Sequence, residues 1–151
     1  MERTVKVFRI GMVSLVAVAM VAMSAVLGAA DTPPPPQLVA NLLDPMAHPM
    51  GKAGYGQKTD STGKITASFL NVQVGPLNKS LVGKKVNVSI NNGPAIPVAV
   101  VLDKSGNNGA ANLSLNSANK DKVPPVKVGS TVTVSTPGDP PFAQGKFASA
   151  K

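Results

Sequence analysis

The stretch "VGKKVNVSINNGPAIPVAVVL" (residues 82–102) decides the fold class. Its first half alternates polar with apolar residues, so Val86, Val88 and Ile90 share one face of an extended strand. The triplet "NNG" that follows is a strong hairpin signal, because Asn and Gly tolerate the positive φ angles of tight turns. The alternation then resumes in "IPVAVVL". The stretch therefore predicts two antiparallel strands with one buried face.

Further alternating segments, separated by turn signals, lie on both sides of this hairpin. Together they predict six strands between residues 64 and 149 and no long helix. We therefore expect an all-β fold, a small antiparallel, immunoglobulin-like β-sandwich of about six to seven strands. Pro97 cannot donate to a β-ladder, so we expect its position to face an unpaired edge. The additional strand segments are "KITASFLNVQV" (64–74), "AANLSL" (110–115), "TVTVS" (131–135) and "FAQGKFAS" (142–149).

The frame V-G-x-x-V-x-V-S occurs twice, at residues 82–89 and 128–135. Each copy places a glycine just before a strand, where a turn often needs positive φ, and then two alternating valines. The segments between the two copies do not align with each other. We therefore interpret the copies as a recurring pattern of a turn followed by a strand, not as a duplicated domain.

Residues 1–30 predict a secretory signal peptide. Three basic residues within the first nine precede the uncharged run "IGMVSLVAVAMVAMSAVLGAA", which ends in small residues. We expect cleavage after Ala30 and export from a bacterial cell to the periplasm, the cell surface or the exterior. The alternative is an uncleaved membrane anchor, since residues 10–30 are numerous enough to span a bilayer.

Residues 31–63 predict a disordered Pro/Gly-rich linker, followed by one folded domain at residues 64–151. The segment "TPPPPQ" (32–37) favours a stiff, solvated polyproline II spacer. The stretch after it is rich in Gly, Pro and polar residues and lacks a long periodic element. The alternative is that this stretch donates an edge strand or packs locally through Met46, Met50 and Tyr55. The chain contains no cysteine, so neither a disulfide nor a lipid-modified cysteine contributes to its structure.

Few residues are candidates for chemistry. His48 is the only histidine and falls in the predicted linker, which disfavours a nucleophilic triad and a zinc site. The six aspartates beyond residue 30 fall in the linker or in turns, and we interpret Asp103 in "DKSGNNG" as a turn acceptor and not as a calcium ligand. We therefore predict no catalytic, cofactor-binding or metal-binding residues and no enzyme. An enzyme or an inhibitor would need a site that the sequence does not reveal.

The remaining chemical feature is positive charge. The formal net charge is +8, and beyond residue 9 the chain has twelve lysines and no arginine. Nucleic acid is disfavoured as a partner because arginine and a set of stacking aromatic residues are missing there. Lysines in loops and strand starts could form one basic rim that contacts anions. The candidates are Lys84, Lys85, Lys120, Lys122 and Lys127.

These observations favour a monomeric, non-catalytic structural or binding module of the bacterial cell envelope or exterior. The alternative is electrostatic adhesion to an anionic envelope polymer or lipid surface through the lysine-bearing loops. In a simpler interpretation, the lysines keep strand edges from pairing and keep the protein soluble.

The runs "LVGKKVNVSINNG", "VVLDKSGNNGAANLSL" and "KVPPVKVGSTVTV" resemble β-sandwich modules in secreted bacterial proteins of planctomycete-like genomes. The resemblance covers residues 81–134, a little over a third of the chain, and its motifs are turn and core positions. It implies the sandwich fold and export. It transfers no catalytic residue.

Overall fold

The computed structural model describes residues 33–151, so the predicted signal peptide or anchor lies outside the described residues. None of the helices in this part of the chain is long and apolar enough to cross a membrane. The elements in chain order are β1 (Leu38–Leu43), β2 (Pro49–Thr59), β3 (Ile65–Leu77), η1 (Lys79–Leu81), β4 (Lys85–Ile90), β5 (Ile96–Leu102), β6 (Gly109–Asn116), η2 (Ser117–Asn119), β7 (Thr131–Ser135), β8 (Ala143–Lys146) and β9 (Ala148–Ser149).

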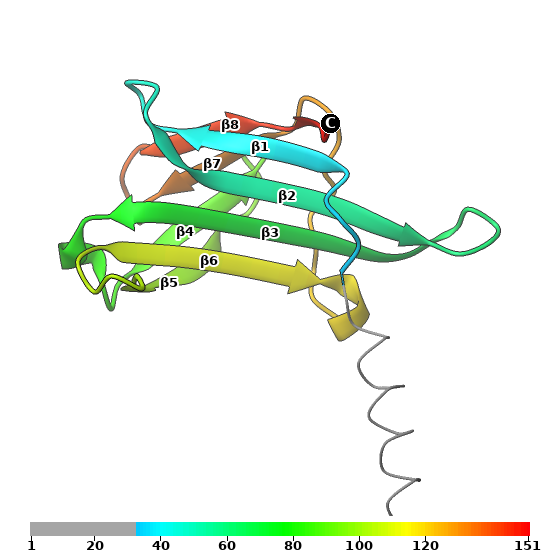
Figure 1. Ribbon diagram of the computed structural model, residues 1–151, viewed down its shortest axis with the longest axis horizontal. Coiled ribbons are helices and arrows are strands. Elements are labelled where there is room, and N and C mark those ends of the chain that lie inside the picture. Colours follow the sequence, from blue (N-terminus) through cyan, green and yellow to red (C-terminus); the bar gives the residue numbers. More distant parts are fainter. Residues whose placement is uncertain (1–32) are drawn as a thin grey trace, which may run out of the picture. The chain divides into compact units, whose positions relative to one another are not determined.

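The strands form one sheet that closes on itself (Figure 1). Its order is β2-β3-β6-β5-β4-β7-β8-β1, and β1 also pairs with β2, which closes an eight-stranded antiparallel barrel. β9 is an extra strand that pairs with the start of β1. The expectation of an immunoglobulin-like β-sandwich of six to seven strands is therefore wrong, because the chain forms a closed barrel.

The missing strands lie in the segment that was predicted to be a disordered linker. Residues 31–63 contain β1 and β2, whereas β3 to β8 coincide with the six predicted segments. The prediction failed for β2 because the inward-facing Ala53 is small and the outward-facing Gly54 and Gly56 carry no side chain. It failed for β1 because the outward-facing Val39 and Leu43 are as apolar as the buried Leu42. Such positions give little contrast between apolar and polar residues, so the period of two is hard to detect.

Side chains fill the interior of the barrel. An eight-stranded barrel leaves an interior just wide enough for them. Val86, Val88 and Ile90 are buried, as the alternation around the first hairpin predicted. Tyr55, from the segment predicted as linker, is 5 % exposed, and its hydroxyl accepts a hydrogen bond of 2.8 Å from Nε2 of Gln57.

β5 and β6 pair over only a short distance. Their ladder consists of the pairs formed by Val100, Val101 and Leu102, so the first half of β5 has no partner on that side. Pro97 lies in this unpartnered half and faces Asn87 of β4 on its other side. The proline therefore occupies the kind of position that its missing amide hydrogen predicts.

The antiparallel order places alternate connections at the same end of the barrel. We call the end where β1 begins the proximal end and the other the distal end. The connections at the proximal end are residues 60–64, 91–95 and 117–130, and those at the distal end are residues 44–48, 78–84, 103–108 and 136–142. The connection 117–130 joins strands that are not neighbours, and its Val126 packs into the core. This connection therefore covers the proximal end.

The proline-rich segment before β1 lies against the outer face of β2. A Cβ atom placed on Gly54 would be 3.1 Å from Cβ of Pro36, and one placed on Gly56 would be 3.3 Å from the carbonyl oxygen of Pro35. The amide of Gln37 donates to the carbonyl of Tyr55 at 2.8 Å. The two glycines thus leave room for the prolines on the barrel surface.

Barrel closure between β1 and β8 depends on Gly145. A Cβ atom there would overlap the carbonyl oxygen of Asn41 on β1. We therefore expect Gly145→Ala to lower the free energy of unfolding by about 3 kcal/mol, because one of the two backbones has to shift. Urea denaturation of both proteins would measure this difference.

Gly63→Ala is the matched control for this substitution. Gly63 has φ of 82°, and a Cβ atom there meets nothing within 4 Å. The control should lower the free energy of unfolding by only about 1 kcal/mol, because an alanine is strained in the left-handed backbone region. Equal losses in the two variants would contradict the assigned role of Gly145.

Candidate functional site

The five lysines predicted as anion contacts do not form one rim. All five are exposed. Lys84 and Lys85 lie at the distal end, where β4 begins, whereas Lys120, Lys122 and Lys127 lie in the connection that covers the proximal end. The structure therefore separates the predicted set into two groups at opposite ends of the barrel.

Three further lysines lie at the proximal end, where sequence reasoning did not place them. Lys58 is the penultimate residue of β2, Lys64 lies in the turn between β2 and β3, and Lys146 is the last residue of β8. The strand order reveals this grouping, because in an antiparallel barrel the end of β2, the end of β6 and the end of β8 share one end. We call the set the lysine rim: Lys58, Lys64, Lys120, Lys122, Lys127 and Lys146.

Charge is distributed unequally between the two ends. The lysine rim has six lysines against two aspartates, Asp60 and Asp121, and Lys151 follows β9 at the same end. The distal end has four lysines and three aspartates: Lys79, Lys84, Lys85, Lys104, Asp44, Asp103 and Asp139. Exposed charges interact over a Debye length of about 8 Å at physiological ionic strength, so those rim lysines that lie within this distance of one another add to one local potential. The proximal end is thus the electropositive end of the barrel.

The two aspartates of the proximal end are engaged by the backbone. Asp60 accepts hydrogen bonds from the hydroxyl of Thr62 at 2.6 Å and from the amides of Thr62 and Lys64 at 2.8 and 3.0 Å. These bonds, the Thr62 hydroxyl first, lower the pKa of Asp60. Asp121 accepts from the amide of Asn116 at 2.9 Å. Among residues 33–151 no lysine ammonium group lies within ion-pair distance of a carboxylate, so the rim lysines are available to an outside anion.

Ser130 fixes the connection that carries Lys127. It is 3 % exposed, and its hydroxyl accepts from the amide of Lys127 and from Nδ2 of Asn91, both at 3.1 Å. Asn91 has φ of 52°, and its Oδ1 accepts from the amide of Thr131 at 2.9 Å. The "NNG" turn, the end of the connection 117–130 and the start of β7 are therefore joined by hydrogen bonds at the proximal end.

The carboxylates of the distal end also stabilise turns. Asp103 accepts from the hydroxyl of Ser105 at 2.6 Å, which is the main reason that its pKa is lowered. Oδ2 of Asp44 lies 2.9 Å from Nδ1 of His48, and hydrogen bonds from the backbone and the side chain of His48 lower the pKa of Asp44. His48 is therefore part of the β1–β2 turn and not of a linker. Within residues 33–151, no three His, Cys, Asp or Glu side chains are grouped to hold a metal.

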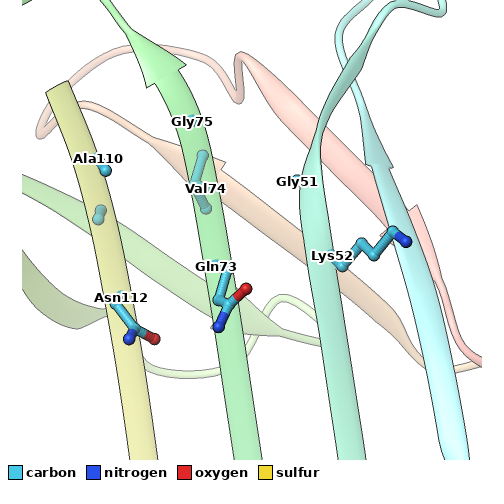
Figure 2. Close-up of a pocket in the computed structure, with 8 residues that line it drawn as sticks. Gly51, Lys52, Gln73, Val74, Gly75, Ala110 and Asn112 are labelled. Carbon is cyan, nitrogen blue, oxygen red and sulfur yellow. The ribbon is translucent and has the colours of Figure 1, made fainter. Parts of the chain in front are cut away.

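A groove of about 350 Å³ lies on the outer face of the barrel, across β2, β3 and β6 (Figure 2). Gly51, Gly75 and Ala110 line it and leave space there because their side chains are absent or short. The amide side chains of Gln73 and Asn112 lie side by side at its edge. A second hollow, of about 470 Å³, lies beside the β1–β8 seam. Sequence reasoning found neither surface, because both combine strands that are distant in the chain.

Comparison of the chain with protein families, with curated proteins and with solved structures found no match. The surface chemistry of the barrel is therefore what bears on function.

The lowered pKa values of Asp44, Asp60 and Asp103 predict a loss of stability in acid. A carboxyl whose pKa is lower in the folded state stabilises the fold above its unfolded pKa of about 4, and this contribution disappears as the pH falls through the folded pKa. We expect the free energy of unfolding, measured by urea denaturation, to fall between about pH 5 and pH 2.

Asp60→Asn tests the origin of this loss. The asparagine keeps an oxygen that accepts from the Thr62 and Lys64 amides, but it does not titrate. The variant should lose less stability than the wild type over the same pH range. An identical pH dependence in both proteins would show that Asp60 does not contribute.

Proposed function

We propose that the protein is an exported, non-catalytic binding module that attaches to an anionic polymer of the bacterial envelope through the lysine rim. The observation that carries this proposal is the unequal charge, six lysines against two aspartates at the proximal end. Both aspartates are engaged by backbone amides, so they do not neutralise the lysines by direct contact.

The expected attachment is weak at each lysine and depends on their number. An exposed ion pair contributes about 0 to 1 kcal/mol and is screened by salt. Several lysines on one rim attract a polymer that bears many negative charges, because all of them act on it at once. Binding of this kind falls as the ionic strength rises.

We propose that the module acts as a monomer. Closure of the barrel leaves few free strand edges, which otherwise promote association between sheets. The first half of β5 has no partner on one side, but Pro97 there has no amide hydrogen to donate. This edge is therefore poorly suited to pair with a strand of another molecule.

Sedimentation of the purified barrel, residues 31–151, with isolated bacterial envelopes over a salt series tests the proposal. All strand pairing lies within this segment. The triple variant Lys120→Gln, Lys122→Gln, Lys127→Gln should bind about tenfold more weakly at low salt, a change equivalent to about 1.4 kcal/mol. Wild-type binding should fall steeply as salt rises.

The matched control is the triple variant Lys79→Gln, Lys84→Gln, Lys85→Gln. It removes the same number of exposed lysines, but from the distal end. We expect it to sediment like the wild type. Equal losses in both triple variants, or no sedimentation of the wild type at low salt, would refute attachment through the lysine rim.

A further inference from the structure

A row of polar side chains crosses four strands on the outer face of the barrel. Asn41 on β1 is the direct neighbour of Lys52 on β2, Lys52 of Gln73 on β3, and Gln73 of Asn112 on β6. All four residues are exposed. Neighbouring strands lie about 4.8 Å apart, so the row presents one polar group at each such step. We call these four residues the amide row.

The groove of Figure 2 runs beside the amide row. Gln73 and Asn112 belong to both, and the side chain of Lys52 extends from β2 toward β1. Gly51 has to be glycine, because a Cβ atom there would overlap the carbonyl oxygen of Gln73. The hollow and the amides beside it are therefore fixed by the paired backbones of β2 and β3.

A peptide cannot bind by adding a strand to β2 or β3. Strand addition needs a free sheet edge, and at the groove both of these strands are paired on both sides. Recognition on β2 and β3 must therefore come from side chains that point outward. A ligand with its own hydroxyl groups suits them, since each amide offers both donors and acceptors.

The charge of this face selects an anionic ligand. The segments β1, β2, β3 and β6 contain no aspartate or glutamate, and they contain two lysines, Lys52 and Lys58. Lys52 lies in the amide row, so it can meet a carboxylate while the neighbouring amides bond hydroxyls. We propose that the groove and the amide row bind a carboxylated glycan.

The proposal deepens the proposed function, and it rests on that function for the anionic envelope polymer, to which it assigns a chemical class. Gln73, Asn112 and Asn41 bond sugar hydroxyls, and the Lys52 ammonium group pairs with a sugar carboxylate. The surface involved is separate from the lysine rim: Lys52 is six residues before Lys58 on β2, toward the distal end.

Nuclear magnetic resonance titration of the barrel (residues 31–151) with a mannuronate tetramer tests this inference. We expect the side-chain amide signals of Gln73 and Asn112 to shift and to saturate. The double variant Gln73→Ala, Asn112→Ala should raise the Kd about tenfold, as expected for the loss of two hydrogen bonds. Lys52→Gln should weaken the binding of the tetramer but not that of a neutral cellotetraose.

The control pair is Asn87→Ala with Gln144→Ala, which removes one asparagine and one glutamine from other strands of the barrel. It should leave the Kd of the mannuronate tetramer within about twofold of the wild type. The inference is overturned if the tetramer shifts no groove signal at millimolar concentration, if the control pair weakens binding equally, or if tetraglutamate shifts the same signals to the same extent.

The Lys120→Gln, Lys122→Gln, Lys127→Gln variant separates the two proposals. It should keep the tetramer-induced shifts in the groove while its sedimentation with envelopes weakens about tenfold. In the wild type, sedimentation without groove shifts refutes the glycan site alone, and groove shifts without sedimentation refute attachment through the lysine rim alone.

Discussion

The pairing of β1 on both of its sides is the constraint on which the rest of the structure depends. β1 forms six ladder pairs with β2 but only one, Leu43 with Gln144, with β8. β9 adds two pairs at the start of β1. Without β1, the sheet would end in two free edges, which attract other strands. The thin seam to β8 therefore depends on close backbone contact, and Gly145 permits that contact because it has no Cβ atom to meet Asn41.

Closure also determines where function can reside. Eight strands leave an interior that side chains fill, and large residues such as Phe147 and Leu42 are balanced there by small ones such as Ala40 and Ala53. The two hollows lie outside this core. Ligand contacts are therefore expected on the outer face and at the barrel ends, where polar side chains project from a backbone that the ladders hold rigid.

The sequence predicted most strands but not the fold. The valines of β4 and β7 alternate clearly and are buried where their pattern indicates, whereas β5 alternates only as far as Val100, since Val101 and Leu102 are both exposed. β2 was missed because alanine and glycine carry little hydrophobic contrast, although these are the residues that a narrow barrel and a covering proline segment require. β1 was missed because the apolar Val39 and Leu43 face outward beside the buried Leu42, which hides the period of two. The lysine grouping and the amide row were also beyond sequence reasoning. Both depend on strand order and register, which bring together residues as distant as Asn41 and Asn112.

The two proposed surfaces differ in physical range, and this difference assigns them different tasks. As proposed, the lysine rim would act through screened charge over about 8 Å, so it would attract any anionic polymer and lose strength as salt rises. The amide row acts through hydrogen bonds, which need contact and correct geometry and are less sensitive to salt. The rim lies at the proximal end, where β1 begins, and the amide row lies along the side of the barrel. The rim would collect an anionic polymer near the proximal end. The amide row would then select it by the pattern of its hydroxyl and carboxylate groups, so the two surfaces would complement each other.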